Sequence, residues 1–486
     1  MATITSSSGV SSILGQYSGI GSTQIDKLIE AESVPKLRAQ ARVSSIEAQK
    51  AAYSDVRSRL SNLMNKLDDL TDASTYTSKK TSSSDEKIAT ISGDSKSIAG
   101  NYDLKVSQLA THTRLIGNKI SDDSKKKLGL TGTFTINSNK LDSTGVAKTF
   151  DFDITAEDSL AMIATKINKK SSESGVAAVI MDGRLVLSNT ETGDKALSIV
   201  DNALTDSLGI SSTKAQLQQG KDALFNINGI DMTSQSNVVS DKIDGVSITL
   251  KQVTSGDTVV HLGLENDNDK ILTAVKDFVS QYNSTYSFIG DSLDVGTPKV
   301  STDTSTTKNK QGALVGDSLM VRLQGQLRNQ GTANPNYADL RVSQIGISID
   351  KDGVMKLDET KLRKAIEENP NAVQEFFSGK QADATTNSPA TTGYADNMKE
   401  LLNRYLKDST SENGQVSRGL LKSRTDSFDA LIKDLNKQID GFDEKINAKR
   451  TYYINMFTKL DTAMMKAEEQ MNYFLSQAGV QTGNGK

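Results

Sequence analysis

The sequence predicts an α+β protein in which the two ends of the chain form a long α-helical coiled-coil stalk and β-rich head domains are inserted between them. One observation is that apolar residues near both ends recur at alternating three- and four-residue steps, the spacing of a coiled-coil seam. Another is that the middle of the chain holds short segments in which apolar and polar residues alternate, as in half-buried strands. The order helix, strands, helix places both ends in one stalk and the head domains at its far end.

The N-terminal end begins with residues 1–22, which are rich in Ser and Gly and are predicted to be disordered. A helix is expected from about Thr23 to Glu32, and Pro35 is expected to interrupt or restart it, because proline is not tolerated in a helix interior. A long helix then runs to about Leu70. The predicted seam of this helix consists of Tyr53, Val56, Leu60, Leu63 and Leu67.

The C-terminal end predicts one helix from about Val416 to Leu475, which at ~1.5 Å per residue is roughly 90 Å long. Its apolar stripe keeps the same alternating steps, with Lys449 and Gln470 as polar positions in that register. The residues predicted to pack against the N-terminal helix are Phe428, Ile432, Leu435, Ile439, Phe442 and Ile446.

The last part of this stripe is the candidate contact surface. The N-terminal helix, counted from Pro35 to Leu70, is shorter than the C-terminal one, so the seam from about Tyr453 to Leu475 is expected to lack a partner within the chain. Each unpartnered large side chain offers ~1.5–3 kcal/mol on burial, which favours association. The candidate contact residues are Tyr453, Met456, Phe457, Leu460, Met464, Phe474 and Leu475.

The middle of the chain predicts short strands, one helix and one tight hairpin. The four residues from Thr155 to Asp158 look like a capping box that opens a helix through Ile167. Asp182-Gly183 is a strong hairpin signal. The strands are predicted at Lys87–Ile91, Tyr102–Val106, Thr133–Ile136, Phe150–Ile154, Val176–Met181, Arg184–Ser188, Leu224–Ile227, Val246–Leu250 and Thr258–Leu262.

Beyond the strands the chain returns to helix. The predicted elements are helices near Lys270–Ile289, Leu314–Leu327, Glu359–Glu368 and Asn371–Phe377, a hairpin at Ile345–Leu357, and polar loops at Val295–Gly312 and Gly379–Gly393. We expect seven segments: a flexible or helical leg (1–40), the first part of the stalk domain (41–78), a β head domain in two parts (79–112 and 221–265), an inserted outer head domain (113–220), the main part of the stalk domain (266–425) and a coiled-coil leg (426–486).

Composition excludes several classes of function. The chain has no cysteine, so it has no disulfide, thiolate nucleophile or thiolate metal ligand. Its formal net charge of −3 is not the basic balance of a nucleic-acid-binding protein. The start of the chain carries no signal-peptide pattern, and the longest apolar run, Val176–Met181, is too short to enter a membrane as a span. We therefore expect the chain to be cytosolic or exported without a cleaved signal.

Two motifs suggest catalysis or metal binding, and both have simpler interpretations. Gly-Asp-Ser-Leu occurs at 290–293 and 316–319, but both histidines, His112 and His261, precede these serines, and Ser318 lies where a helix should begin. Asp350-Lys-Asp-Gly353 resembles part of a calcium loop but fits a hairpin turn better. We therefore predict no catalytic residue, no cofactor and no metal site.

Short stretches along nearly the whole chain carry a family resemblance. They are Gly19–Ser22, Ile25-Asp26, Pro35–Leu37, Phe225–Gly229, Ser236-Asn237, Ile243–Val246, Thr249–Lys251, Phe278-Val279, Tyr282-Asn283, Ile345–Ile347, Asp352-Gly353, Leu357-Asp358, Asn369-Pro370, Phe376-Phe377, Tyr453, Phe457, Leu460-Asp461 and Gln470. In their order and number these stretches resemble the flagellar filament cap proteins, which are hook-associated proteins. Asp151–Val200 is similar to an insert module shared with flagellins.

The resemblance implies a structural protein of bacterial motility. Such caps are exported through the flagellar secretion apparatus, form a ring-like homo-oligomer at the extracellular filament tip, and help exported flagellin to fold and insert. An export chaperone binds the C-terminal helix in this family, so the resemblance assigns flagellin and chaperone contact to the candidate residues between Tyr453 and Leu475. The alternatives are another axial protein, such as a junction protein or a flagellin, an adhesin at the filament tip, or an esterase using Ser318.

Overall fold

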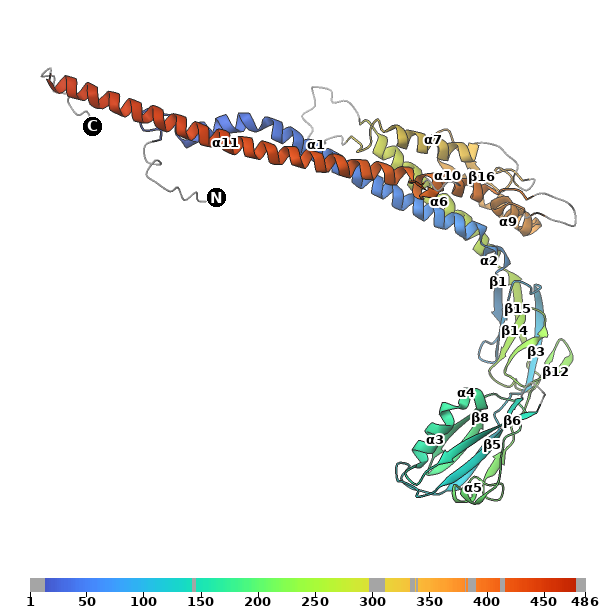
Figure 1. Ribbon diagram of the computed structural model, residues 1–486. Coiled ribbons are helices and arrows are strands. Elements are labelled where there is room, and N and C mark those ends of the chain that lie inside the picture. The colour runs from blue at the N-terminus through green and yellow to red at the C-terminus, as the bar shows by residue number, and fades with distance from the viewer. Residues whose placement is uncertain are drawn as a thin grey trace. The chain divides into compact units, whose positions relative to one another are not determined.

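The computed structural model describes residues 14–141, 146–296, 311–332, 337, 340–380, 382, 390–410 and 416–477, and the chain divides into two compact units. Unit 1 comprises residues 1–71 and 272–486, and unit 2 comprises residues 72–271. Long helices form the ends of the chain and antiparallel sheets form its middle (Figure 1). The predicted α+β class is therefore confirmed, while the finer division into seven segments remains a prediction.

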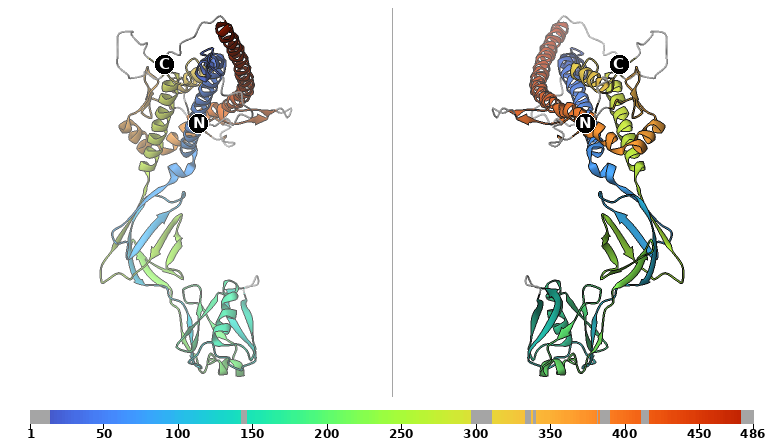
Figure 2. Two further views of the ribbon diagram at one scale, coloured as in Figure 1. Left: turned by 90° about the vertical axis from the view of Figure 1, so that its left-hand side faces the viewer. Right: turned by 90° about the vertical axis from the view of Figure 1, so that its right-hand side faces the viewer.

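Two long helices dominate unit 1. Helix α1 runs over Ser22–Thr71, and helix α11 runs over Leu420–Gln477. They lie along one another, as the blue and red ribbons show in the views of Figures 1 and 2. Neither helix is apolar on all sides, so each buries its apolar stripe only where another element packs against it.

Shorter elements cover the second half of α1, where α9 and α10 contact it. Leu60, Leu63 and Leu67 of α1 are fully buried there. The remaining elements of unit 1 are α6 (Asn268–Leu293, whose first turn lies in unit 2), α7 (Ser318–Thr332), β16 (Ile347–Ile349), β17 (Met355–Leu357), α8 (Glu359–Glu368), α9 (Pro370–Ser378), α10 (Tyr394–Leu406), β18 (Ser409–Thr410) and β19 (Val416–Ser417).

Helix α10 was not predicted, although its sequence carries a signal. Tyr394, Met398, Leu401 and Tyr405 recur at helical spacing, and all four are buried. The Tyr394 ring packs 5.6 Å from the ring of Phe376, which fixes the start of α10 against α9. The stripe is short and directly follows a polar segment, so its signal in the sequence is weak.

Unit 2 has two hydrophobic cores, and the first lies between two antiparallel sheets. Alternation is clear in β14, where Val246, Ile248 and Leu250 point into this core. One sheet has the order β1-β15-β3-β11-β12, and the other has the order β13-β14-β2. The strands are β1 (Lys79–Ser83), β2 (Ala89–Gly93), β3 (Gly100–Gln108), β11 (Ala223–Ile227), β12 (Ile230–Ser234), β13 (Val238–Ile243), β14 (Val246–Leu250) and β15 (Val260–Asn266), and helix α2 (Ala73–Thr77) precedes them.

The second core of unit 2 lies between a sheet of order β10-β4-β8-β7, a sheet of order β6-β5-β9, and helix α3 (Leu160–Lys169). The predicted hairpin is confirmed: Asp182 and Gly183 both have positive φ, 46° and 70°, in the turn between β7 and β8. The other elements are β4 (Arg114–Lys119), β5 (Gly132–Leu141), β6 (Ala147–Ile154), α4 (Ser171–Ser174), β7 (Val176–Met181), β8 (Arg184–Asn189), β9 (Ser198–Ile199), α5 (Ala203–Ser207) and β10 (Gln216–Gln218).

The predicted cap of α3 was misplaced by four residues. Ser159, not Thr155, is the N-cap, and its hydroxyl accepts from the N–H of Met162. Asp158 instead accepts from the N–H of Thr155 and forms an ion pair with Lys166 at 2.5 Å. The carboxylate thus closes the turn before the helix, and the helix begins later than the motif indicated.

Two expectations about the N-terminal end were wrong. Helix α1 continues through Pro35 without a break, because its pairing with α11 holds both sides of the proline in line. Residues 14–21 are ordered against α11, although disorder was predicted, while residues 1–13 lie outside the described residues. Most of the two predicted polar loops, 297–310 and 383–389, also lies outside them.

Candidate assembly interface on the terminal helices

Ion pairs fix the register of α1 against α11. Residue numbers rise along one helix as they fall along the other, so the two helices are antiparallel. Exposed pairs of this kind contribute little stability, but together they select one register. The pairs are Lys50–Asp429, Lys36–Asp443, Glu32–Lys449 at 3.3 Å and Asp26–Arg450 at 2.7 Å.

A buried carboxylate anchors the N-terminal segment to α11. Asp461 has no exposed surface, and its oxygens accept hydrogen bonds from the backbone N–H groups of Gly15 (2.6 Å), Ser18 (2.6 Å) and Tyr17 (3.2 Å). The bond from Gly15, helped by those from Ser18 and Tyr17 and opposed by burial, lowers the pKa of Asp461. We call residues 14–21 with Asp461 the N-terminal clasp; its role was not predicted.

A glycine is required in this clasp. Gly15 has a φ of +86°, a conformation that L side chains rarely adopt. A Cβ at this position would lie 2.9 Å from the Cα of Gly21. The tight turn that brings three N–H groups onto one carboxylate therefore depends on Gly15.

The predicted coiled-coil seam is buried on α1 and only partly buried on α11. Tyr53, Val56, Leu60, Leu63 and Leu67 are buried. The Tyr53 ring meets the Phe428 ring edge-on, with centroids 5.4 Å apart. On α11, Phe428 and Leu435 are buried, whereas Ile432, Ile439, Phe442 and Ile446 are partly exposed.

The candidate contact residues become more exposed toward the end of α11. Tyr453 and Phe457 are partly buried and stack with ring centroids 6.3 Å apart, and the Tyr453 hydroxyl donates to Glu32 at 3.2 Å. Met456, Leu460 and Met464 are each about two-fifths exposed (38%, 42% and 41%), and Phe474 is 71% exposed. Leu475 is partly buried.

The segment that packs along α11 is longer than the sequence predicted. Because α1 begins at Ser22 and the N-terminal clasp extends the contact to Asp461, the partner of α11 is longer than the segment from Pro35 to Leu70. The exposed apolar residues of α11 therefore arise in two ways. Met456 and Leu460 lie on a face that α1 does not cover, and Met464 and Phe474 lie beyond the clasp.

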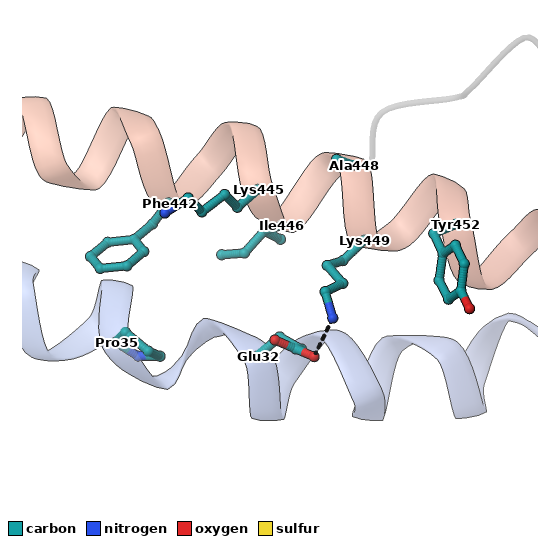
Figure 3. A pocket seen from close by; sticks show the side chains of 8 residues that line it. All are labelled: Glu32, Pro35, Phe442, Lys445, Ile446, Ala448, Lys449 and Tyr452. Carbon is teal, nitrogen blue, oxygen red and sulfur yellow. Dashed lines mark hydrogen bonds and ion pairs between the residues drawn. The ribbon is translucent and has the colours of Figure 1, made fainter.

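An open groove of about 640 Å³ lies between α1 and α11 (Figure 3). Pro35 lines the groove from α1, opposite the Phe442 and Ile446 side chains of α11. The ion pair between Glu32 and Lys449 crosses it. The remaining lining residues are Lys445, Ala448 and Tyr452.

The two Gly-Asp-Ser-Leu motifs have structural roles. The Asp317 carboxylate accepts hydrogen bonds from the N–H groups of Leu319 and Met320 at the start of α7. It also accepts one from the Tyr53 hydroxyl at 2.7 Å. Burial, followed by this bond to Asp317, raises the pKa of Tyr53. Ser318 is exposed at the first position of α7, and the Ser292 hydroxyl donates to the carbonyl of Phe288.

The other candidate chemistry also has local structural explanations. The Asp350 carboxylate accepts from the N–H groups of Asp352 and Val354, so it closes the hairpin turn between β16 and β17. His112 bonds to the carbonyl of Asn189, and His261 pairs with Asp103. Among the described residues, no group of three or more potential metal-ligating side chains comes together, and no helix is both long and apolar enough to cross a membrane.

Comparison with known protein families decides what this arrangement belongs to. The family model described as the C-terminus of flagellar hook-associated protein 2 matches residues 220–469, just over half of the 486-residue chain. The chain belongs to the flagellar hook-associated protein 2 family. A model of the N-terminus of the same protein matches residues 19–113, and the flagellin hook IN motif matches residues 133–191, overlapping the predicted insert module.

Relatives of the hook-associated protein 2 family match over most of their length. The A-type flagellar hook-associated protein 2 of Pseudomonas aeruginosa is 26% identical over 481 residues, which cover 92% of this chain and 93% of that protein. The flagellar hook-associated protein 2 of Salmonella typhimurium is 28% identical over 373 residues, covering 73% and 74% of the two chains.

A solved structure agrees with this assignment. The D1-D2-D3 domains of the flagellar cap protein FliD from Escherichia coli match with a TM-score of 0.59 and 26% identity, covering 78% of this chain and 99% of that chain. The resemblance found in the sequence and the filament-cap function that it implied are confirmed. The chain is a structural protein of the flagellar filament tip, and the alternatives of a junction protein, a flagellin or a tip adhesin are not favoured.

Proposed function

We propose that this cap protein works as a ring-like homo-oligomer whose terminal helices contact flagellin. The observation that carries this proposal is the set of exposed apolar residues near the end of α11, where Met456, Leu460 and Met464 keep about two-fifths of their surface exposed and Phe474 is 71% exposed. Covering the surface that these side chains still expose favours association, because burying apolar surface contributes roughly 25 cal/mol per Å². In a cap, the subunit available to cover them is flagellin at the filament tip.

The same residues support contact with an export chaperone before secretion. A partner that covers Met456 and Leu460 in the cytoplasm keeps the helix from associating too early. Export through the flagellar secretion apparatus without a cleaved signal peptide fits a chain that has no disulfide to obstruct unfolding. The protein acts without catalysis, which the structural roles of Ser292 and Asp317 support.

The experiment that tests the contact row uses Leu460→Asp, which places a charge on the exposed row. Binding of purified flagellin and of the export chaperone is measured by isothermal titration calorimetry. Leu431→Asp is the matched control, since Leu431 is also an exposed leucine of α11 (44%) but lies outside the row. We expect Leu460→Asp to lose binding and Leu431→Asp to keep it; unchanged binding by Leu460→Asp refutes the assignment.

The catalytic alternative has its own test. Ser318 is exposed but takes part in the start of α7 through its neighbour Asp317. We expect Ser318→Ala to cap filaments and support swimming like the wild type. A loss of capping by this variant, with its fold intact by circular dichroism, contradicts the non-catalytic assignment.

A further inference from the structure

Helix α11 carries a row of residues at heptad spacing. Helix α1 covers the start of this row but not its C-terminal end. The row repeats every seven residues in two series: Ile446, Tyr453, Leu460, Ala467 and Phe474, and Phe442, Lys449, Met456, Ala463 and Gln470. Exposure rises along it, from partly buried Phe442 and Ile446 to Met456 at 38%, Leu460 at 42% and Phe474 at 71%.

The contact with α1 passes to a neighbouring flank of α11 over the same length. Asp443 pairs with Lys36, Arg450 pairs with Asp26, and Asp461 holds the N-terminal turn. Asp443 and Arg450 are one heptad apart, and Asp461 follows Arg450 by 11 residues, about three helical turns, so all three share a face. On a straight helix, residues seven positions apart are rotated by ~20° about the helix axis. The heptad row therefore turns gradually away from the face of α11 that contacts α1.

The groove at Pro35 is where the row first becomes open. Pro35 has no N–H to bond to the carbonyl of Ala31, and its ring occupies the space of that bond. Across from it, Phe442, Ile446 and Tyr452 line a space of about 640 Å³ (Figure 3). This volume is large enough for several big side chains of another helix, and the exposed row continues from it toward the end of α11.

One edge of the open row is basic. The positions just before the first series are Lys445, Tyr452, Lys459, Lys466 and Tyr473, all seven residues apart. Within the described part of the chain, no acidic group pairs with Lys445, Lys459 or Lys466. Such flanking positions choose the partner of a coiled coil through interhelical ion pairs.

We propose that the groove and the open heptad row hold a third helix, an amphipathic helix of flagellin that carries acidic residues along the edge facing Lys445, Lys459 and Lys466. This proposal rests on the proposed function and adds the geometry and charge of the contact. The heptad period calls for a helix as the occupant, because only a helix meets a seam of that spacing over several turns. The basic edge requires acidic partners.

The α11 helix of a second copy does not meet these requirements. Antiparallel pairing of two such rows sets the lysine edge of one against the lysine edge of the other, where like charges repel. Parallel pairing sets the lysine edge against Arg450, Phe457 and Met464, which offer no acidic group. Charge therefore favours a different protein over self-pairing of this helix.

The test reverses the charge of the edge in the full-length protein. The variant Lys459→Glu/Lys466→Glu is titrated with purified flagellin, and its ring formation is followed by light scattering. Lys433→Glu/Lys437→Glu is the matched control, with the same charge change on the same helix away from the open row. Ala448→Trp fills the groove from an exposed position, with Ala448→Ser as its control.

We expect the edge variant to bind flagellin roughly tenfold more weakly and with a smaller salt dependence, while both lysine variants form rings. Ala448→Trp should also weaken binding. Flagellin in which acidic residues of the docking helix are changed to Lys should restore binding to the edge variant. Equal binding by the edge variant and its control overturns the proposal.

The other outcomes distinguish a failure of this proposal from a failure of the proposed function on which it rests. If the edge variant loses only chaperone binding, or only ring formation, the groove belongs to the chaperone or to a second copy, and the flagellin assignment is wrong. If the wild type itself neither forms rings nor binds flagellin, the proposed function fails and this inference fails with it.

Discussion

At the residue scale, Asp461 holds together segments that lie at opposite ends of the chain. Its carboxylate is buried and takes three backbone N–H groups from residues more than 440 positions away. A carboxylate at the clasp is stronger than a neutral acceptor, because hydrogen bonds to ionised groups are roughly twice as strong as neutral ones.

Substituting Asp461 by Asn tests the clasp. The amide keeps one acceptor oxygen but turns its NH₂ group toward the N–H donors, so residues 14–21 should detach more often. We expect their amide hydrogens to exchange roughly tenfold faster or more, measured by hydrogen–deuterium exchange. Asp440→Asn, on an exposed position of the same helix, is the control and should leave the exchange unchanged.

The pKa of Asp461 predicts how the clasp responds to pH. The folded state lowers this pKa, so the clasp contributes stability above the unfolded-state value of ~3.9 and loses it as pH falls through the lower folded-state pKa. Exchange of residues 14–21 should be flat from neutral pH down to about pH 4 and then rise, after correction for intrinsic rates. In Asp461→Asn that acid-dependent rise should be absent.

The role of Asp461 could not be predicted from the sequence. The family resemblance included Leu460-Asp461, but the partners of Asp461 are backbone groups, which carry no side-chain signature. In contrast, the turn at Asp182-Gly183 was predictable because a two-residue hairpin depends only on the conformations of its own residues.

At the element scale, α1 shows that pairing outweighs a local helix breaker. Pro35 costs a hydrogen bond, yet the helix continues, because ion pairs to α11 lie on both sides of it: Asp26–Arg450 before and Lys36–Asp443 after. The rule that proline ends a helix describes an isolated segment, and here tertiary contacts outweigh it.

Replacing Pro35 by Ala should therefore stabilise the protein. The N–H at position 35 regains its bond to the Ala31 carbonyl, so we expect unit 1 to gain about 1–3 kcal/mol, seen as a higher unfolding temperature by circular dichroism at 222 nm. A lower unfolding temperature would show that the proline is required for the native helix pair.

The buried half of α1 predicts a contrasting pair of variants. Leu60 is fully buried, whereas Leu37 on the same helix is 55% exposed. Leu60→Ala should cost about 2–5 kcal/mol in a urea titration, and Leu37→Ala less than about 1 kcal/mol. Equal costs would contradict the orientation of α1 in unit 1.

The seam shows how far periodicity carries a prediction. The heptad steps predicted the two long terminal helices, because those steps follow directly from helix geometry, and the seam residues proposed on α1 are buried. They did not show that α1 stops covering the heptad row of α11 near Ile446. That departure depends on the path of a second helix around Pro35, and no local pattern in α11 encodes it.

At the scale of the whole molecule, the two units differ in how completely they bury their apolar residues. Unit 2 encloses two cores between antiparallel sheets, while unit 1 buries the second half of α1 but leaves apolar residues of α11 exposed. A chain that has both a closed unit and an open helical surface has what a subunit needs if it assembles with others and contacts a helical partner. The fold class and the family could be predicted from sequence; the clasp and the groove could not, since both need the three-dimensional register of α1 and α11.

The most direct test of the account is the assembly state of the purified full-length protein, measured by light scattering and negative-stain electron microscopy at increasing concentration. The account predicts small closed rings, or pairs of rings, whose mass stops increasing once the ring is complete. A strictly monomeric particle at high concentration, or growth into long filaments, would contradict a self-assembling cap.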